Sequence, residues 1–310
     1  MAVRLYSRAV ALDIVMPFWG DPGHLREAVE SVLKQTDPRW RLLVIDDVYP
    51  DTAPGEWVKA LYDARVRFER NVTNLGPSRN YSKGVAAVYA DFVVIMGCDD
   101  RMLPGFVARV HELFELHPDC DIVQPGVRVI DEHGDASTPM SDRIKSAIMP
   151  RGARPVALRG EPVARSLLQG NWTYFPSLVW RRSLVVGGFR PDLNVVQDLA
   201  KILEILFDDG TLVLDDHPVF EYRRHSTSVS ARTAVDGSKY GQEATLFAEA
   251  DAQARTLGWT RAARAARWHW TSRLSALSVV PAALRARHWQ GVRALLRHSF
   301  SLPRPSPRAT

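Results

Sequence analysis

Two pairs of adjacent carboxylates are the residues of this chain best suited to chemistry. Asp99 and Asp100 follow the apolar run Phe92 to Met96 after a Gly-Cys step, and Asp46 and Asp47 end a second apolar run. Two neighbouring acids at a turn can reach one hard cation, and a metal with a phosphate-bearing ligand is the simplest interpretation. A solvated Asp-Asp turn without any ligand is the alternative that these residues leave open.

Buried strands that alternate with helices would place these carboxylates at one edge of a sheet. The apolar runs before Asp47 and Asp99 are typical of strands covered on both faces. Residues 11–36 read as a strand, a loop and an amphipathic helix, and residues 74–90 as a turn followed by a helix. This alternation predicts a doubly wound α/β layer whose ligands bind beyond the carboxyl ends of the strands.

An ordered series of motifs resembles the inverting glycosyltransferases of family 2, of the bacterial type. Between residues 11 and 230 the chain contains, in the family's order, PFWGDPGHLREAVESVLKQT, RLLVIDD, TNLGPSRN, MGCDDRMLPG, SLVWRRSLVVGGFR, VVQDLAKILEIL and FEYRRHSTSVS. The resemblance implies the GT-A fold of the α/β class, a mixed and mostly parallel sheet flanked by helices. It also implies a nucleoside-diphosphate sugar as donor and a divalent metal, Mn²⁺ or Mg²⁺.

The resemblance assigns contacts with the donor to Pro17, Asp47, Arg79, Asp99 and Arg223. Asp47 would bind the base or its ribose, because a carboxylate accepts paired N–H or hydroxyl donors. Arg79 would contact the nucleotide from the first turn of its helix, although a surface ion pair is the alternative. Arg223 would neutralise phosphate charge.

The resemblance assigns the metal to Asp99, with Asp100 and His225 as further ligands. Two positions before Asp99 the family usually has another acid, where this chain has Gly97. With fewer carboxylates, the ion would depend on diphosphate oxygens and water, or metal dependence would be weak. The ion would act as a Lewis acid toward the leaving nucleoside diphosphate. An ordinary surface role is the alternative for His225.

Asp198 matches the acid that serves as general base in this family. An inverting transfer needs one carboxylate to take the proton of the acceptor hydroxyl, a contribution of about 10²- to 10⁴-fold in rate. The alternative is a helix N-terminal acid favoured by the helix dipole, and both roles are compatible. Gln197 stands where the family often has Glu, and its amide could orient a neighbour in the acceptor site.

The acceptor side rests on aromatic residues in the stretch GNWTYFPSLVW. Trp172 and Tyr174 could stack on a sugar ring and line the acceptor site. Packing in the core is the alternative, and it is favoured for Phe175 and Trp180. The resemblance as a whole predicts a hexosyltransferase-like enzyme of cell-wall or polysaccharide biosynthesis that glycosylates a hydroxyl of a glycan or glycolipid.

Charge divides the chain sharply. Residues 1–250 hold 29 Lys and Arg against 34 Asp and Glu, whereas residues 251–310 hold 11 Arg and one acid, Asp251. The predicted domains are a GT-A catalytic domain at 1–230, a basic amphipathic helical region at 231–300, and a disordered tail at 301–310.

The basic region is interpreted as a peripheral membrane element. Its arginine-rich helices carry Trp268, Trp270 and Trp289, and residues 251–300 are therefore expected to contact an anionic membrane surface. Within this region we expect a helix at 261–280 that ends at Pro281. Packing against the catalytic domain or a second subunit is the alternative.

Composition excludes several other classes. Two cysteines provide no disulfide framework, and the chain lacks both an 18-residue apolar run and a signal-peptide core, so a cytoplasmic protein on the inner face of the membrane is expected. A nucleic-acid binder would not explain the acids at the strand ends, and no dinucleotide or P-loop motif is present. A non-catalytic nucleotide-sugar-binding module, or a partner subunit of a glycan-assembly complex, stays open because of Gly97.

Overall fold

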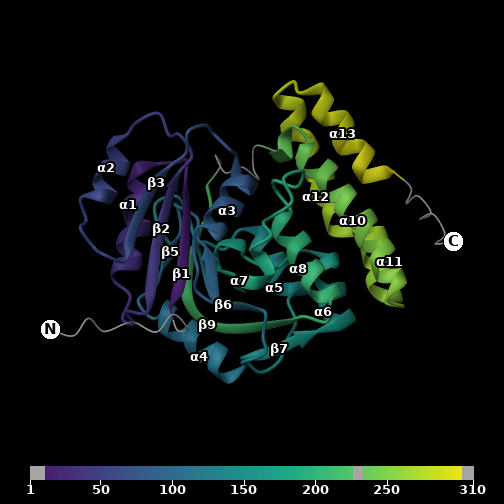
Figure 1. The fold of residues 1–310 in the computed structure, drawn as a ribbon. Coiled ribbons are helices and arrows are strands. Elements are labelled where there is room, and N and C mark those ends of the chain that lie inside the picture. Colours follow the sequence, from purple (N-terminus) through teal and green to yellow (C-terminus); the bar gives the residue numbers. More distant parts are fainter. Residues whose placement is uncertain (1–10, 226–232, 302–310) are drawn as a thin grey trace.

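The computed structural model describes residues 11–225 and 233–301 (Figure 1). The predicted tail therefore lies outside the described residues from position 302 onward. The strands of the described part are β1 (Leu12–Phe18), β2 (Trp40–Asp46), β3 (Val66–Arg70), β4 (Phe92–Ile95), β5 (Arg101–Met102), β6 (Ile122–Ile130), β7 (Val156–Arg159), β8 (Val179–Arg181) and β9 (Thr211–Arg223).

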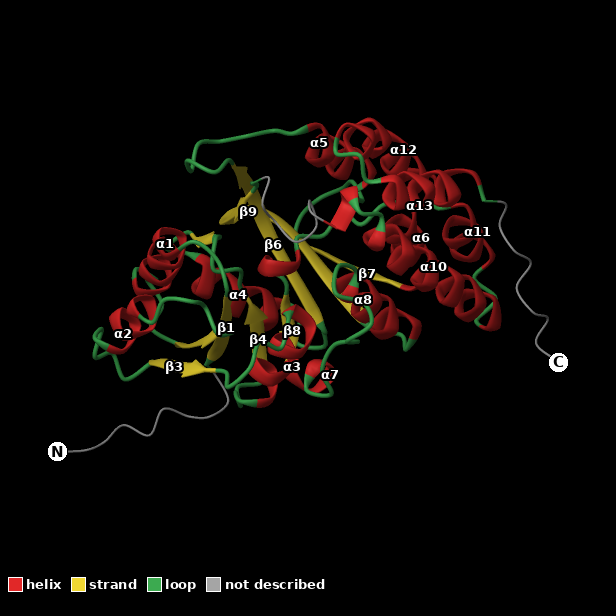
Figure 2. Ribbon diagram, turned by 90° about the horizontal axis from the view of Figure 1, so that it is seen from above, coloured by secondary structure: helices red, strands yellow, loops and turns green. Residues whose placement is uncertain are grey.

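Helices cover both faces of the sheet and extend beyond it at the C-terminal side (Figure 2). The helices described are α1 (Pro22–Leu33), α2 (Ala53–Lys59), α3 (Pro77–Ala86), α4 (Phe106–Leu116), α5 (Met140–Ile148), α6 (Gly160–Gln169), the 3-10 helix η1 (Phe175–Ser177), α7 (Arg182–Val185), α8 (Gln197–Phe207), α10 (Ser238–Thr256), α11 (Thr260–Trp268), α12 (Trp270–Arg285) and α13 (Trp289–Phe300).

The sheet is mixed, with the order β3-β2-β1-β4-β8-β6-β9-β5, and β7 pairs with β9. Strands β3, β2, β1 and β4 run parallel, with Leu12 opposite both Trp40 and Phe92. Because parallel strands end at the same edge, the loops after β1, β2 and β4 meet there. The predicted α/β layer with acids at one edge is therefore present.

The two faces of the sheet pack on different helices because side chains alternate along each strand. Ile14 and Met16 face a buried cluster with α1 and α4, whereas Val15 faces the cluster that contains α3, α6 and α8. Helix α3 approaches β1 closely at Gly84, where an added Cβ would lie 2.3 Å from Val15 Cγ1. This contact fixes the helix that begins beside the edge of the sheet.

Strand β9 returns the chain to the loop that follows β4. It runs parallel to β6 with an irregularity at Gly126, and it is antiparallel to β5. Its last residue, Arg223, thereby reaches Asp99 and Asp100 from more than 120 positions away in the sequence. The loop that carries these carboxylates is held by long-range contacts as well as by its own turn.

The C-terminal helices complete the core of the molecule. Ala254 of α10 and Ala262, Ala263 and Ala266 of α11 are buried in the same cluster as α6 and α8. The carboxylate of Glu161 in α6 accepts hydrogen bonds from the first backbone N–H groups of α11. Packing against the catalytic part, one of the two alternatives for this region, is therefore observed for α10 and α11.

The helix break in this region lies at His269 and not at Pro281, which is a correction to the sequence-based expectation. His269 has a positive φ of 27° and its ring stacks on Phe247. Pro281 lies inside α12, because one proline removes a single backbone hydrogen bond and need not end a helix. None of the helices in the described ranges is both long enough and apolar enough to cross a bilayer.

Candidate active site

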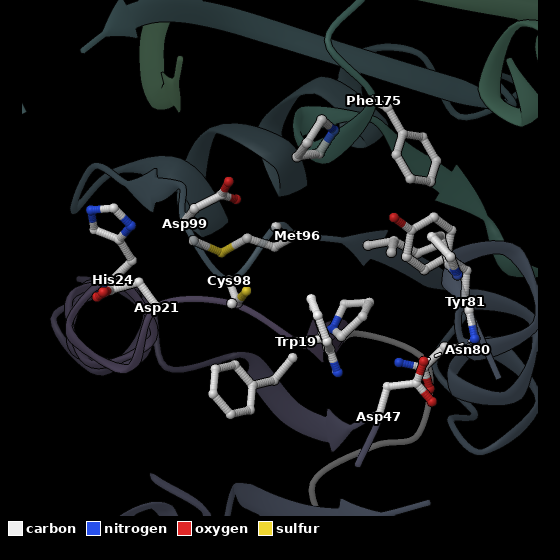
Figure 3. Close-up of a pocket in the computed structure, with 18 of the residues that line it drawn as sticks. Trp19, Asp21, His24, Asp47, Asn80, Tyr81, Met96, Cys98, Asp99 and Phe175 are labelled. Carbon is white, nitrogen blue, oxygen red and sulfur yellow. Dashed lines mark hydrogen bonds between the residues drawn. The ribbon is translucent and has the colours of Figure 1, made fainter. Parts of the chain in front are cut away.

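A cavity of about 690 Å³ opens where β1, β2 and β4 end (Figure 3). Asp99 and His24 lie toward one end of it, and Asp47 and Asn80 lie toward the other. Its walls come from the loops after these strands, the start of α3, and η1. The lining residues are Pro17, Phe18, Trp19, Gly20, Asp21, His24, Asp47, Asn74, Gly76, Pro77, Asn80, Tyr81, Ile95, Met96, Gly97, Cys98, Asp99, Glu132, Phe175, Pro176 and His225.

Asp47 is a fixed acceptor at one end of the cavity. Its carboxylate accepts hydrogen bonds from Asn71 Nδ2 at 2.7 Å, from the backbone N–H of Leu75 at 2.8 Å, and from that of Gly76 at 2.9 Å. These bonds tie the end of β2 to the turn before α3, which places Asp47 against the cavity. Asp46 instead forms an ion pair with Arg70 and does not line the cavity.

Asp99 and His225 meet at the other end. His225 Nε2 lies 2.7 Å from Asp99 Oδ2, and this hydrogen bond with the carboxylate raises the pKa of the imidazole. Both side chains line the cavity. An acid from the end of β4 and an imidazole from beyond β9 are thus brought together, as the predicted site requires.

Asp100 does not line this cavity, although it was predicted as a metal ligand. The residue is 1% exposed, and its Oδ1 accepts the backbone N–H of Arg223 at 2.8 Å. Within the described residues its Oδ2 has no hydrogen-bond partner. Burial, followed by the neighbouring charge of Asp99, raises the pKa of Asp100 well above 3.8. The side chain points inward because the chain turns between the two acids.

The structure gives a physical reason for the glycine two positions before Asp99. A Cβ added at Gly97 would lie 2.6 Å from Asp99 Oδ1 and 2.5 Å from Asp100 Oδ2. The two carboxylates therefore occupy the space that a side chain at this position would need. The loop is built for glycine, and an acid here would require both carboxylates to move.

The potential metal ligands on this chain are few. Among the residues that the structure describes, no group of three or more His, Cys, Asp or Glu side chains is close enough to hold a metal ion. The predicted set of Asp99, Asp100 and His225 is thus assembled only as the pair of Asp99 and His225. That pair fits an ion such as Mg²⁺, which takes one or two protein ligands and completes its shell with phosphate oxygens and water.

Arg223 is buried beneath the loop and does not face the cavity, which corrects its predicted contact with phosphate. Its Nε donates to the backbone oxygen of Asp99 at 2.7 Å, and its other nitrogens reach Glu27 Oε2 at 2.6 Å and the Glu132 oxygen at 3.1 Å. Because its donors are taken by protein acceptors, the guanidinium positions the Asp99 loop.

Arg79 is likewise outside the cavity. Its neighbours Ser78 and Asn80 are buried, and a helix that turns about 100° per residue directs the side chain between them to solvent. Arg79 is exposed, but the surface ion pair that was the alternative is not found for it among the described residues. Tyr81, two positions later, is the residue of α3 that lines the cavity beside Asn80.

Asp198, the predicted base, is a buried carboxylate at the start of α8. Its Oδ2 accepts a hydrogen bond from Asn171 Nδ2 at 3.0 Å. Burial raises the pKa of Asp198 above 3.8, and the hydrogen bonds and the charge of Lys145 oppose this shift. Asp198 is not among the cavity-lining residues, but Tyr81 lies within electrostatic reach of both Asp99 and Asp198.

None of the three predicted acceptor residues lines the cavity. Trp172 is fully buried and donates from Nε1 to Ser166 Oγ at 3.1 Å. Tyr174 donates its hydroxyl to Asp142 at 2.9 Å, and Gln197 accepts from Ser78 Oγ at 3.3 Å. Each is hydrogen-bonded to a partner inside the protein.

The aromatic residues that do line the cavity were missed or assigned to the core. Trp19, Tyr81 and Phe175 surround it from three different elements. Trp180 is fully buried, as expected, but Phe175 reaches the cavity from η1. The position of Trp19 in the sequence could have indicated its place in the cavity, because it directly follows the first strand and ligands of such sheets bind beyond the strand ends.

The fold is similar to that of solved GT-A glycosyltransferases. TarS of S. aureus (residues 1–349) aligns with 93% of this chain and 81% of its own at a TM-score of 0.65 and 14% identity. The mannosyltransferase PcManGT from Pyrobaculum calidifontis, solved in complex with GDP-Man and Mn²⁺, aligns over 94% and 86% with a TM-score of 0.61 and 13% identity. The predicted fold class is confirmed.

The chain belongs to glycosyl transferase family 2, whose family model matches residues 13–174. It is 27% identical over 128 residues to the uncharacterized glycosyltransferase MJ1057 of Methanocaldococcus jannaschii, covering 40% of this chain and 44% of that protein. The O-antigen biosynthesis protein RfbC of Myxococcus xanthus is 28% identical over 240 residues, covering 75% and 17%. The chain thus spans less than half of either relative.

Proposed function

We propose that this protein transfers a sugar, with inversion, from a nucleoside diphosphate to a hydroxyl of a glycan or glycolipid acceptor. The observation that carries the proposal is the cavity beyond β1, β2 and β4, with Asp47 at one end and the Asp99–His225 pair at the other. Membership of family 2 and the O-antigen role named for RfbC support polysaccharide assembly as the setting.

The two ends of the cavity suit the two parts of the donor. Asp47 and Asn80 would offer oxygen and amide groups to a base or ribose, and Pro17 of β1 lines the same cavity. Asp99 and His225 would then face the diphosphate, and the planar side chain of Tyr81 lies beside Asn80 at the nucleoside end. The order nucleoside, diphosphate, sugar would follow the length of the cavity.

Asp99 and His225 would hold a divalent metal together with the donor. A bound Mg²⁺ or Mn²⁺ supplies Lewis-acid neutralisation of the charge that develops on the leaving diphosphate. The contribution of Arg223 is indirect, because it holds the Asp99 backbone in place. The complex of PcManGT with GDP-Man and Mn²⁺ supports this assignment by analogy of fold.

Asp198 would remove the proton from the acceptor hydroxyl as that oxygen attacks the anomeric carbon. Burial raises its pKa, and a carboxylate with a raised pKa is a stronger base toward a hydroxyl. Asn171 holds one of its oxygens in place. Lys145, whose pKa burial lowers to about 8, contributes charge nearby, and its Nζ is anchored on the Thr173 carbonyl.

The C-terminal helices would carry the enzyme to an acceptor at an anionic membrane surface. Large apolar side chains of α12 and α13 are exposed, among them Trp270 at 59%, Trp289 at 68% and Phe300 at 68%. Arginines surround them in a region with a single acid. Aromatic side chains beside arginines are the composition of an interfacial surface.

The first experiment measures the thermal stability of the full chain with UDP, GDP and dTDP, each with and without Mn²⁺. A ligand at a hundredfold excess over its dissociation constant stabilises a protein by about 2.7 kcal/mol. A metal-dependent rise in Tm with one diphosphate, lost in Asp47→Ala and in Asp99→Ala, supports the donor site. No response to any of the three would contradict the donor assignment.

A non-catalytic nucleotide-sugar-binding module is the second candidate, favoured by Gly97 in place of the usual acid. The same protein incubated with a nucleotide sugar and a glycan acceptor separates the two functions. Release of nucleoside diphosphate that requires both the acceptor and Asp198 identifies the enzyme. Binding of the donor without any release identifies the module.

A further inference from the structure

A second cavity, of about 450 Å³, lies on the C-terminal helices and shares no lining residue with the donor cavity. It is formed by the end of α10 and one face of α11, which in Figure 1 lies at the opposite side of the molecule from β1 to β3. The residues that line it are Arg255, Thr260, Ala263, Arg264, Arg267 and Trp268.

Within the described residues, the positive charge of this cavity is only partly balanced by ion pairs. Arg255 pairs with Asp251, its Nε lying 2.7 Å from Oδ1, and Asp251 is the only acid between residues 251 and 310. No ion pair is found for Arg264 or Arg267 within the described part of the chain. The buried Nε of Arg267 also has no hydrogen-bond partner there. Guanidiniums gathered in this way attract an anion.

The geometry of α11 explains why these side chains share one space. The cavity-lining residues of α11 lie along one side of the helix, because they are spaced by three or four positions or are adjacent. They include Thr260, Arg264, Arg267 and Trp268. Ala263 between them is small and leaves room. Trp268 stacks on Trp270, with ring centroids 5.3 Å apart and planes 4° from parallel, which gives the cavity a fixed wall.

We propose that this cavity binds a phosphate group. A guanidinium presents its donors in a planar fork that matches two phosphate oxygens, and the forks of Arg264 and Arg267 with the Thr260 hydroxyl can satisfy a tetrahedral anion. The proposal does not depend on the glycosyltransferase activity, because no residue is common to the two cavities. The phosphate comes from a lipid headgroup or from solution, and both have the same chemistry.

Isothermal titration of inorganic phosphate into the full chain, with a chelator present to remove divalent metal, tests the site. Arg264→Gln/Arg267→Gln should raise the dissociation constant for phosphate by at least about tenfold, because two charge-assisted contacts are lost. Arg285→Gln/Arg293→Gln is the matched control. It removes the same charge from exposed positions of α12 and α13 outside the cavity, and its affinity for phosphate should equal that of the parent.

Two further variants separate the site from charge and from folding. Arg264→Lys/Arg267→Lys keeps the charge but loses the fork, so its affinity should fall between those of the parent and the Gln variant. If circular dichroism finds the Gln double variant unfolded, Arg264→Gln alone, at an exposed position, carries the test. Absence of phosphate binding, or equal affinity in the Gln variants and the parent, overturns the proposal.

Sedimentation with vesicles identifies the source of the phosphate. The parent is compared on phosphatidylcholine vesicles with and without phosphatidic acid. Retention that requires phosphatidic acid and is lost in Arg264→Gln/Arg267→Gln assigns the site to a lipid headgroup. Binding of inorganic phosphate without retention on either vesicle assigns it to a phosphate in solution, and both results support the site.

Discussion

Asp198 illustrates at the residue scale how neighbours tune a single carboxylate. Burial raises its pKa, while the Asn171 amide and the Lys145 charge stabilise the ionised form. The carboxylate is held by the Asn171 amide and by backbone N–H groups at the start of α8. Changes to Asn171 and to Asp198 itself therefore have separate expected effects on the proposed reaction.

Asn171→Ala should move the acid limb of the kcat/KM profile to higher pH. The Asn171 amide lowers the pKa of Asp198, so its removal raises that pKa further and the base becomes protonated at higher pH. The profile of transfer against pH measures this. Asn194→Ala, an exposed position on the loop before α8, is the control. An acid limb at the same pH in both variants would contradict the assignment of Asp198.

Asp198→Asn should reduce transfer by about 10²- to 10⁴-fold and leave nucleotide affinity unchanged. It should also raise the Tm near neutral pH. Because the folded pKa of Asp198 is above 3.8, the protonated carboxyl stabilises the fold at low pH, and this stability is lost as pH rises through the folded pKa. Asparagine avoids that loss. Full turnover in this variant would remove Asp198 as the base.

At the scale of elements, the ends of three parallel strands build the donor cavity, and β9 secures the loop after β4. Arg223 at the end of β9 binds the backbone of Asp99 and packs beside Asp100. Gly97 leaves the space into which both carboxylates turn. The position of the Asp99 carboxylate thus depends on one glycine and one distant arginine.

Gly97→Ala should weaken the binding of nucleoside diphosphate by about tenfold or more. The new Cβ requires movement of the Asp99 and Asp100 oxygens that lie within 2.6 Å of its position. Titration with the diphosphate identified by thermal stability measures the change. Gly187→Ala, where an added Cβ meets no atom within 4 Å, is the matched control. Equal affinities would mean that the loop yields without disturbing the site.

At the scale of the whole molecule, the C-terminal helices are part of the core and also carry an exposed aromatic surface. Removing them would take away Ala254 and Ala262, which are buried in the same cluster as residues of α6 and α8, and would expose the apolar side chains packed against them. A deletion of residues 251–310 is therefore expected to unfold the protein, and point variants are the better test of membrane contact.

Trp270→Ser/Trp289→Ser should reduce retention on anionic vesicles at least about tenfold while the Tm stays close to that of the parent. Both side chains are largely exposed, so their loss removes apolar area from an interface and little from the core. Sedimentation with vesicles measures retention. Leu116→Ser, at an exposed position on α4, is the control. Undiminished retention of the tryptophan variant would exclude these helices as the membrane surface.

Local patterns determined much of this protein in advance. The structure contains the predicted strands before Asp47 and Asp99 and the predicted helix that buries Leu25, Ala28 and Val29. The predicted family is also confirmed. These features depend on neighbours within a few positions, since periodicity and motif order are properties of short segments. Pro17, Asp47, Asp99 and His225 line the cavity because strand ends of one sheet must meet.

Tertiary structure alone decided which polar side chains face a ligand and which hold the protein together. Five residues that were predicted to contact a ligand instead form hydrogen bonds inside the protein, some with residues more than 100 positions away in the sequence. They are Arg223, Asp100, Trp172, Tyr174 and Gln197. The convergence of the α10 and α11 arginines on one cavity was equally hidden. A motif states a residue's type and order, whereas its partners depend on contacts between distant segments, which no short pattern contains.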